Sequence, residues 1–157
     1  MDEGGQGEKP KVVVDASVAA KWAIPGEPWD EEAKTLRDKI ARGEVEAHAP
    51  ILLLYELASV MWKAALTRIL KPADGAEALK AMGRLGVNIQ ATGWSELPEI
   101  LEIADTTKLT VYDSVYLHVS RRMGAKLVTA DDELKRKGGG VTEILCIKDL
   151  ADAPGKS

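Results

Sequence analysis

The chain has 157 residues, enough for one domain with a sizeable core and too few for two full domains. Hydrophobic residues make up 45% and charged residues 29% of it, a balance typical of a globular protein and not of a disordered one. The net charge of −4 argues against extensive binding to duplex nucleic acid, although an acidic metal site can coexist with local basic patches.

The scarcity of cysteine and histidine narrows the possible chemistry. The single cysteine, Cys146, excludes an internal disulfide, and we expect it to be a buried structural thiol because its neighbours are apolar. The two histidines, His48 and His118, are too few for a histidine-rich metal site. Hard-metal chemistry through carboxylates remains open.

The N-terminal segment does not have the pattern of a signal peptide. The first ten residues are polar and acidic, which excludes a signal peptide, and no apolar run is long enough to cross a membrane. We therefore expect a cytoplasmic protein that has no contact with membranes. The predicted organisation is a flexible tail at residues 1–10, one domain at 11–150 and a short tail at 151–157.

Short β-rich runs alternate with helical patterns along the whole chain. The predicted strands cover residues 11–15, 45–49, 87–91, 126–130 and 142–147. The predicted helices cover residues 16–23, 29–42, 50–69, 72–85, 97–104 and 112–123, with a short charged helix ending at the glycines 138–140. Alternation of this kind predicts an α/β sandwich with a central parallel sheet.

The sequence also makes three more detailed predictions, two about helices and one about the tryptophans. Pro50 is expected at the first position of its helix, where a proline fits well. The spacing of Leu97, Ile100, Leu101 and Ala104 predicts the core face of another helix. Because the chain has no phenylalanine, we expect most of its tryptophans to fill the core, with Trp22 and Trp62 as candidates for a partner surface.

Two acidic residues follow strands. Asp15 ends the first strand and Asp131 follows the strand at 126–130, so both are expected at the edge of the sheet where ligands bind. Each also has an ordinary interpretation: Asp15 or Ser17, and Asp131 or Asp132, could cap the following helix. Asp113 could simply be an acid in the first turn of a helix, where the helix dipole favours it.

Glu56 is harder to explain as an ordinary surface residue. It lies in the most apolar helical segment of the chain, where an unpaired carboxylate is costly. Ser59 and Lys63 share its helical face. Glu56, Ser59 and Lys63 thus form a polar stripe along an apolar helix. Either Glu56 pairs with a lysine or arginine, or the helix lines an acidic groove.

Four carboxylates would suit a hard divalent cation. Magnesium and manganese prefer oxygen ligands, and they activate bound water and neutralise charge that develops on a phosphate. Such a site needs no histidine, cysteine or serine nucleophile. The composition therefore fits metal-assisted hydrolysis of phosphodiesters.

The sequence resembles the PIN-domain nucleases, most closely the VapC-type toxins of prokaryotic toxin–antitoxin pairs. The resemblance covers about residues 11 to 147. Four segments carry it, each with its acid and in the family's order: residues 12–19 around Asp15, residues 54–58 around Glu56, residues 109–117 around Asp113, and residues 127–131 ending at Asp131.

The resemblance implies a three-layer α/β/α sandwich with a central parallel sheet of five strands. It also implies a ribonuclease that requires Mg²⁺ or Mn²⁺ and leaves 5′-phosphate and 3′-hydroxyl ends. The metal-binding and catalytic positions correspond to Asp15, Glu56, Asp113 and Asp131, with Ser17 and Thr129 as supporting hydroxyls. Asp132 stands beside Asp131, so the fourth acid is uncertain by one residue.

Partners follow from the same resemblance. Family members are commonly homodimers, and the toxins among them are inhibited by an antitoxin protein that fills the active-site groove. Lys63 is the preferred candidate for contact with RNA because it shares the face of Glu56, whereas His118 lies off the face of Asp113 and is expected to be structural.

Two other functions stay open at this point. The chain could be a PIN nuclease of RNA processing or decay that has no antitoxin. It could also be a catalytically idle PIN module that binds RNA, although such a module has no need of four acids.

Overall fold

A single parallel sheet forms the centre of the computed structural model, which describes residues 7–24 and 26–152. Its strands are β1 Lys11–Val14, β2 Glu46–Pro50, β3 Asn88–Gln90, β4 Lys126–Thr129 and β5 Ile144–Cys146. They pair in the order β3-β2-β1-β4-β5, and every pair is parallel. The chain therefore builds outward from β1 in both directions, and the strand order reverses between β1 and β4. In open α/β sheets this switch point is where ligands bind.

Helices connect the strands, as parallel pairing requires. The α-helices are α1 Ala16–Ala19, α2 Asp30–Ala41, α3 Leu52–Leu66, α4 Pro72–Gly83, α5 Leu97–Thr107, α6 Val111–Met123 and α7 Asp132–Gly138. Three short 3₁₀ helices are η2 Ala20–Trp22, η3 Trp94–Glu96 and η4 Ile147–Asp152. Residues 1–6 and 153–157, which make up most of the two predicted tails, lie outside the described residues.

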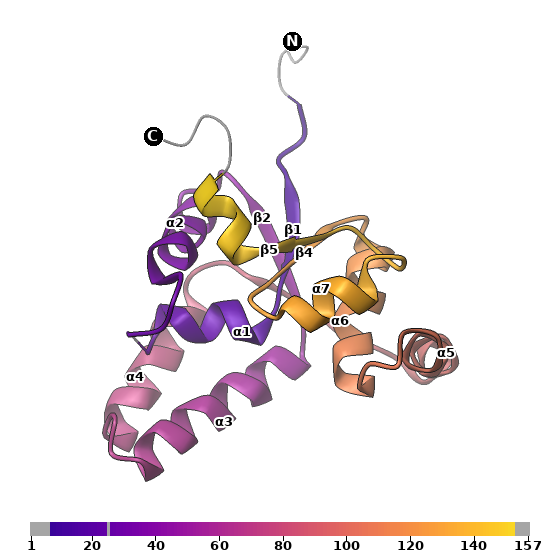
Figure 1. Cartoon of the computed structure of the whole chain (residues 1–157). Coiled ribbons are helices and arrows are strands. Elements are labelled where there is room, and N and C mark those ends of the chain that lie inside the picture. Colours follow the sequence, from indigo (N-terminus) through magenta and orange to yellow (C-terminus); the bar gives the residue numbers. More distant parts are fainter. Residues whose placement is uncertain (1–6, 25, 153–157) are drawn as a thin grey trace.

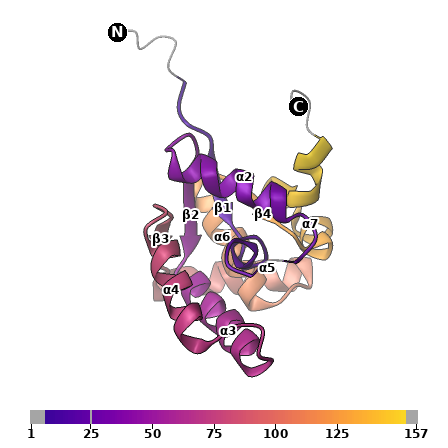
Figure 2. The same cartoon turned by 90° about the vertical axis from the view of Figure 1, so that its left-hand side faces the viewer.

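The centre of the sheet is buried on both faces, which is why the central strand β1 is a continuous run of valines after Lys11, whereas the edge strand β3 is largely exposed. Val12 and Val14 point to one side, where they pack with α1, α2 and α3. Val13 points to the other side and packs with α5, α6 and α7. Figures 1 and 2 show these two helical layers, with α2 lying across the strands. The predicted three-layer α/β/α sandwich is confirmed.

The helices α3 and α4 extend beyond the sheet as an antiparallel pair (Figure 1). Here one expectation was wrong. Pro50 is the last residue of β2, where it pairs with Gln90 of β3, and α3 begins only at Leu52. Although α3 is very apolar, only one of its faces is buried: Tyr55, Trp62 and Leu66 are 68%, 59% and 61% exposed.

Two further expectations about burial were wrong. The core face of α5 is formed by Ile100 and Ile103, whereas Leu97 and Leu101 are exposed, so the buried stripe is rotated from the predicted one. The tryptophans also do not fill the core as expected. Trp29, Trp62 and Trp94 are exposed, and the half-buried Trp22 donates a hydrogen bond to the carbonyl of Ala33 over 2.8 Å.

None of the helices within residues 7–24 and 26–152 has both the length and the apolar character that crossing a lipid bilayer requires.

Candidate active site

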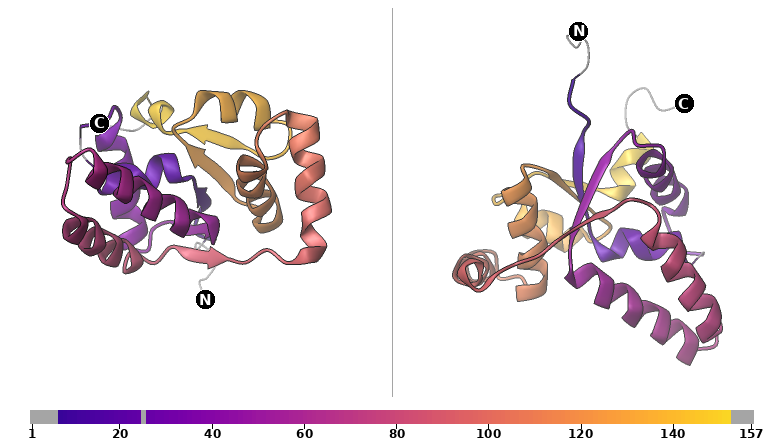
Figure 3. Two further views of the ribbon diagram at one scale, coloured as in Figure 1. Left: turned by 90° about the horizontal axis from the view of Figure 1, so that it is seen from below. Right: turned by 180° about the vertical axis from the view of Figure 1, so that it is seen from behind.

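The four predicted acids are carried by four different elements. Asp15 follows β1 directly, Glu56 lies on α3, Asp113 is in the first turn of α6, and Asp131 is the residue before α7. All four elements start or end at the carboxyl edge of the sheet, which Figure 3 (left) shows from below. The sheet thus brings together residues that are 116 positions apart in the sequence.

Asp15 is the most deeply buried of the four, at 8% exposure. Its Oδ2 accepts two hydrogen bonds, from the hydroxyl of Ser17 at 2.6 Å and from the hydroxyl of Thr129 at 2.8 Å. The side chain makes no capping bond to α1, so the helix-cap interpretation of Asp15 does not apply. Both hydroxyls use the same oxygen, and neither uses Oδ1.

The two supporting hydroxyls also join β1 to β4. The Oγ of Ser17 accepts a hydrogen bond from the amide of Ala130 at 2.9 Å, and the Oγ1 of Thr129 accepts one from the amide of Asp131 at 3.0 Å. Asp15 is therefore tied to the segment that carries Asp131. The small hydroxyl residues predicted beside the acids lie between them.

Glu56 has a hydrogen-bond partner that the sequence did not reveal. The hydroxyl of Tyr116, a residue only 1% exposed, donates to Oε1 of Glu56 over 2.6 Å. The partner is thus a phenol, and the ion pair with a lysine or arginine that could have explained Glu56 is not formed among the described residues. A signal was present, because Tyr116 follows Asp113 by three residues on α6 and so shares its face.

The electrostatics link these carboxyl groups. Burial and the nearby charge of Asp113 raise the pKa of Asp15 above its usual value, although the two hydroxyls oppose this. Burial, followed by the charges of Asp15 and Asp113, likewise raises the pKa of Glu56. Burial and the charges of Asp131 and Glu133 raise the pKa of Asp113. The ionised form of each of these acids is therefore disfavoured, first by burial and then by the neighbouring carboxylates.

No cation relieves this repulsion within the described residues, where lysines and arginines form no ion pair with any of the four acids. The four acids line one edge of the sheet without enclosing a single point. In the described part of the chain, no three acidic, histidine or cysteine side chains converge on one point as they are oriented here.

The structure separates Asp131 from Asp132. Asp131 caps α7, since its Oδ1 accepts hydrogen bonds from the amides of Glu133 and Leu134 at 2.9 and 3.3 Å, and its charge reaches Asp113. Asp132 faces elsewhere: it pairs with Lys148 at 2.8 Å, and the resulting hydrogen bond lowers its pKa. The structure therefore places Asp131 with the other acids and Asp132 outside the group.

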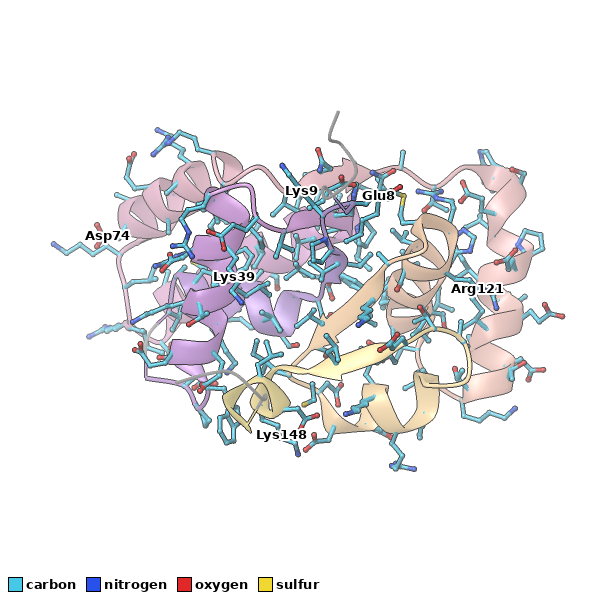
Figure 4. All side chains as sticks on the ribbon, turned by 90° about the horizontal axis from the view of Figure 1, so that it is seen from above. Glu8, Lys9, Lys39, Asp74, Arg121 and Lys148 are labelled. Carbon is cyan, nitrogen blue, oxygen red and sulfur yellow. The ribbon has the colours of Figure 1, made fainter. Side chains whose placement is uncertain are left out.

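Two other singled-out residues can be placed. Lys63 is exposed on α3, two turns beyond Glu56 on the same face. His118 lies between α6 and α5, where its two ring nitrogens contact Glu96 at 2.7 Å and Glu99 at 3.1 Å. Arg121 also bonds to Glu99, between the same two helices (Figure 4). The position of His118 agrees with the expected structural role.

Comparison with known proteins identifies the fold family. The PIN domain family model matches residues 12–140. A curated relative, ribonuclease VapC3 of Pyrobaculum aerophilum, is 28% identical over 128 residues, which are 81% of this chain and 94% of the relative.

Solved structures agree with this match. The crystal structure of PAE2754 from Pyrobaculum aerophilum superposes with a TM-score of 0.67 and 28% identity, over 90% of this chain and 86% of that one. The VapBC2 structure from Rickettsia felis, bound to a promoter DNA fragment, gives a TM-score of 0.61 at 13% identity, over 87% of this chain and 98% of that one; this likeness concerns the fold alone. The family match, the five-stranded sheet and the acids at its switch point agree: the chain belongs to the PIN-domain family.

Proposed function

We propose that this protein is a metal-dependent endoribonuclease and the toxin of a toxin–antitoxin pair. The observation that carries the proposal is the group of four carboxylates at the switch point of the sheet, three of them with raised pKa values and none with a cationic partner among the described residues. Perturbed carboxyl groups that share a cleft are typical of functional sites. The ribonuclease name of the curated relative supports the reaction class.

A divalent cation fits this donor set. Burial, and after it the charges of neighbouring acids, disfavour the ionised forms of Asp15, Glu56 and Asp113, and a bound cation would offset both effects. We propose Asp15, Asp113, Glu56 and Asp131 as the residues that hold Mg²⁺ or Mn²⁺, both of which take oxygen ligands. When bound, the ion would lower the pKa of a water ligand and neutralise charge that develops on the phosphate.

The neighbouring residues have supporting tasks in this proposal. Ser17 and Thr129 fix one oxygen of Asp15 and leave the other to the ligand. Tyr116 occupies Oε1 of Glu56, so Oε2 remains to accept a proton from the attacking water. The water oxygen would bond to phosphorus while the bond to the 3′-oxygen breaks, and the departing 3′-oxygen would take a proton from solvent, which leaves a 3′-hydroxyl and a 5′-phosphate.

Partners belong to the same proposal. RNA would be the substrate, met in the cytoplasm, with Lys63 contacting its backbone. A homodimer and an antitoxin each need an apolar surface, and exposed apolar side chains occur at Trp62 and Leu66 on α3 and, separately, at Trp94 and Leu101 on η3 and α5. The VapBC2 structure of Rickettsia felis supports a paired partner.

The reaction can be tested with purified protein and single-stranded RNA. Cleavage should require Mg²⁺ or Mn²⁺ and stop with EDTA, and cleavage that persists in EDTA would reject the metal. The biological role is tested by expression in a host cell. Growth arrest relieved by co-expressing a small neighbouring gene supports a toxin, whereas unimpaired growth by an active nuclease favours RNA processing.

A further inference from the structure

A hollow of about 290 Å³ opens between the helical turns that follow β1 and the helix α3. Ser17, whose hydroxyl bonds to Asp15, lines it. Its other polar wall residues include Lys21, Lys63 and Thr67. Ser17 thus links the wall of the hollow to Asp15 of the candidate active site.

Lys21 is the unusual member of this wall. It is only 8% exposed, and it forms no hydrogen bond or ion pair with any residue in 7–24 or 26–152. Among the described residues, Asp30 Oδ1 alone is a fully buried side-chain polar atom without a partner, so the unpaired ammonium group of Lys21 retains some contact with solvent. The aliphatic stem is therefore packed while the charge reaches the hollow.

The position of Lys21 relates it to the acids. It follows Ser17 by four residues in the continuous turns of α1 and η2, so the two side chains share a face about 6 Å apart along the axis. Lys63 follows Glu56 by seven residues, about two turns, and so shares its face of α3. Each helix thus presents an acid-site residue first and a lysine farther out.

The charge balance of the hollow favours an anion. Lys21 and Lys63 contribute two positive charges, and Glu27, an exposed residue, contributes the one acid on its wall. The remaining lining is apolar apart from the hydroxyls of Ser17 and Thr67. The ammonium group of Lys21 reaches this hollow without a partner among the described residues, so it is available to an anionic ligand.

We propose that Lys21 and Lys63 form a subsite for a backbone phosphate of the substrate, next to the phosphodiester that is cleaved. A phosphate has the charge and the oxygens to accept hydrogen bonds from both ammonium groups. The subsite rests on the proposed nuclease function and adds to it a means of fixing the strand in register.

The test compares Lys21→Met, which keeps the packed stem, with Lys39→Met as a matched control. Lys39 is exposed near the end of α2, which leads to the start of β2 at the opposite edge of the sheet (Figure 4). Fluorescence anisotropy measures binding of a labelled single-stranded RNA in EDTA across a series of KCl concentrations. Lys21→Arg keeps the charge and serves as the conservative variant, and thermal unfolding checks that each variant is folded.

Lys21→Met should weaken RNA binding about tenfold. It should also reduce the slope of log affinity against log salt by about 0.7, the value for one phosphate contact on a single strand. Lys39→Met and Lys21→Arg should keep the wild-type slope. In cleavage assays Lys21→Met should raise KM more than it lowers kcat.

The outcomes separate the two proposals. If the wild type cleaves and binds RNA while folded Lys21→Met matches Lys39→Met in slope and KM, the subsite is wrong and the nuclease stands. If the wild type neither binds nor cleaves RNA, both proposals fail.

Discussion

The hydroxyl of Tyr116 donates a 2.6 Å hydrogen bond to Oε1 of Glu56, which joins the buried middle of α6 to α3. The bond stabilises the ionised form of Glu56, against the burial and the neighbouring acids that raise its pKa. Tyr116 in turn has a raised pKa, because it is buried and bonded to a carboxylate. It therefore remains a donor at all physiological pH values, and it is positioned to set both the orientation and the protonation of Glu56.

Tyr116→Phe should raise the pKa of Glu56 further, because the hydrogen bond that lowers it is lost. The acid limb of the kcat/KM profile should then move to higher pH, and stability should fall by about 1 kcal/mol. Tyr112→Phe is the matched control, since Tyr112 is exposed on the same helix. An unshifted acid limb in folded Tyr116→Phe would mean that the phenol does not control Glu56.

Thr129→Val should remove a donor to Asp15 and an acceptor for the amide of Asp131 while keeping the side-chain shape. Stability should fall by about 1–3 kcal/mol, because Thr129 is fully buried and a polar partner is left unpaired. The pKa of Asp15 should rise further and reduce activity at low pH. Thr129→Ser should restore both properties, and Thr35→Val, at an exposed threonine of α2, should change neither; denaturant unfolding and pH profiles measure the effects.

Asp113→Asn should stabilise the metal-free protein at neutral pH. Because the folded state raises the pKa of this acid, it binds the proton more tightly than the unfolded state, and stability falls as pH rises through the raised pKa. Removing the charge should raise Tm by about 2–4 °C, the shift that 1 kcal/mol produces at this size. The gain should vanish at low pH, where the wild-type carboxyl is protonated.

Asp74→Asn is the control for this measurement, because Asp74 also lies in the first turn of a helix but is exposed at α4 (Figure 4). Its loss should leave Tm unchanged or slightly lower, as the helix dipole predicts. A lower Tm for Asp113→Asn at neutral pH would contradict the repulsion between the acids.

Asp131→Asn and Asp132→Asn distinguish the two adjacent acids. Asparagine caps helices as well as aspartate, so Asp131→Asn should keep the stability of α7 while cleavage is lost. Asp132→Asn should keep cleavage and lose only the exposed pair with Lys148, which contributes little. Cleavage rates and Tm are compared in parallel, and the reverse pattern of activity would make Asp132 the fourth acid.

The sequence predicted the layers, the five strands and the group of acids because each depends on local patterns: valine runs, helical spacing and the residue after a strand. It did not predict the rotation of the buried face of α5 or the exposure of Trp29 and Trp94, because these depend on which elements pack together. The link from Tyr116 to Glu56 and the shared hollow of Lys21 and Lys63 join segments distant in the chain. The sequence spacings that relate Tyr116 to Asp113 (i+3) and Lys21 to Ser17 (i+4) can be interpreted only once the positions of those helices are known.

The most direct test of the central claim is the cleavage rate of single-stranded RNA by wild type, Asp113→Asn and Asp74→Asn, each with Mg²⁺ or Mn²⁺ and with EDTA. The wild type and Asp74→Asn should cleave at similar rates with metal and not in EDTA. Asp113→Asn, although folded, should be slower by about 100-fold or more. Equal rates for the three proteins, or cleavage that is indifferent to EDTA, would contradict a metal-dependent site built from these acids.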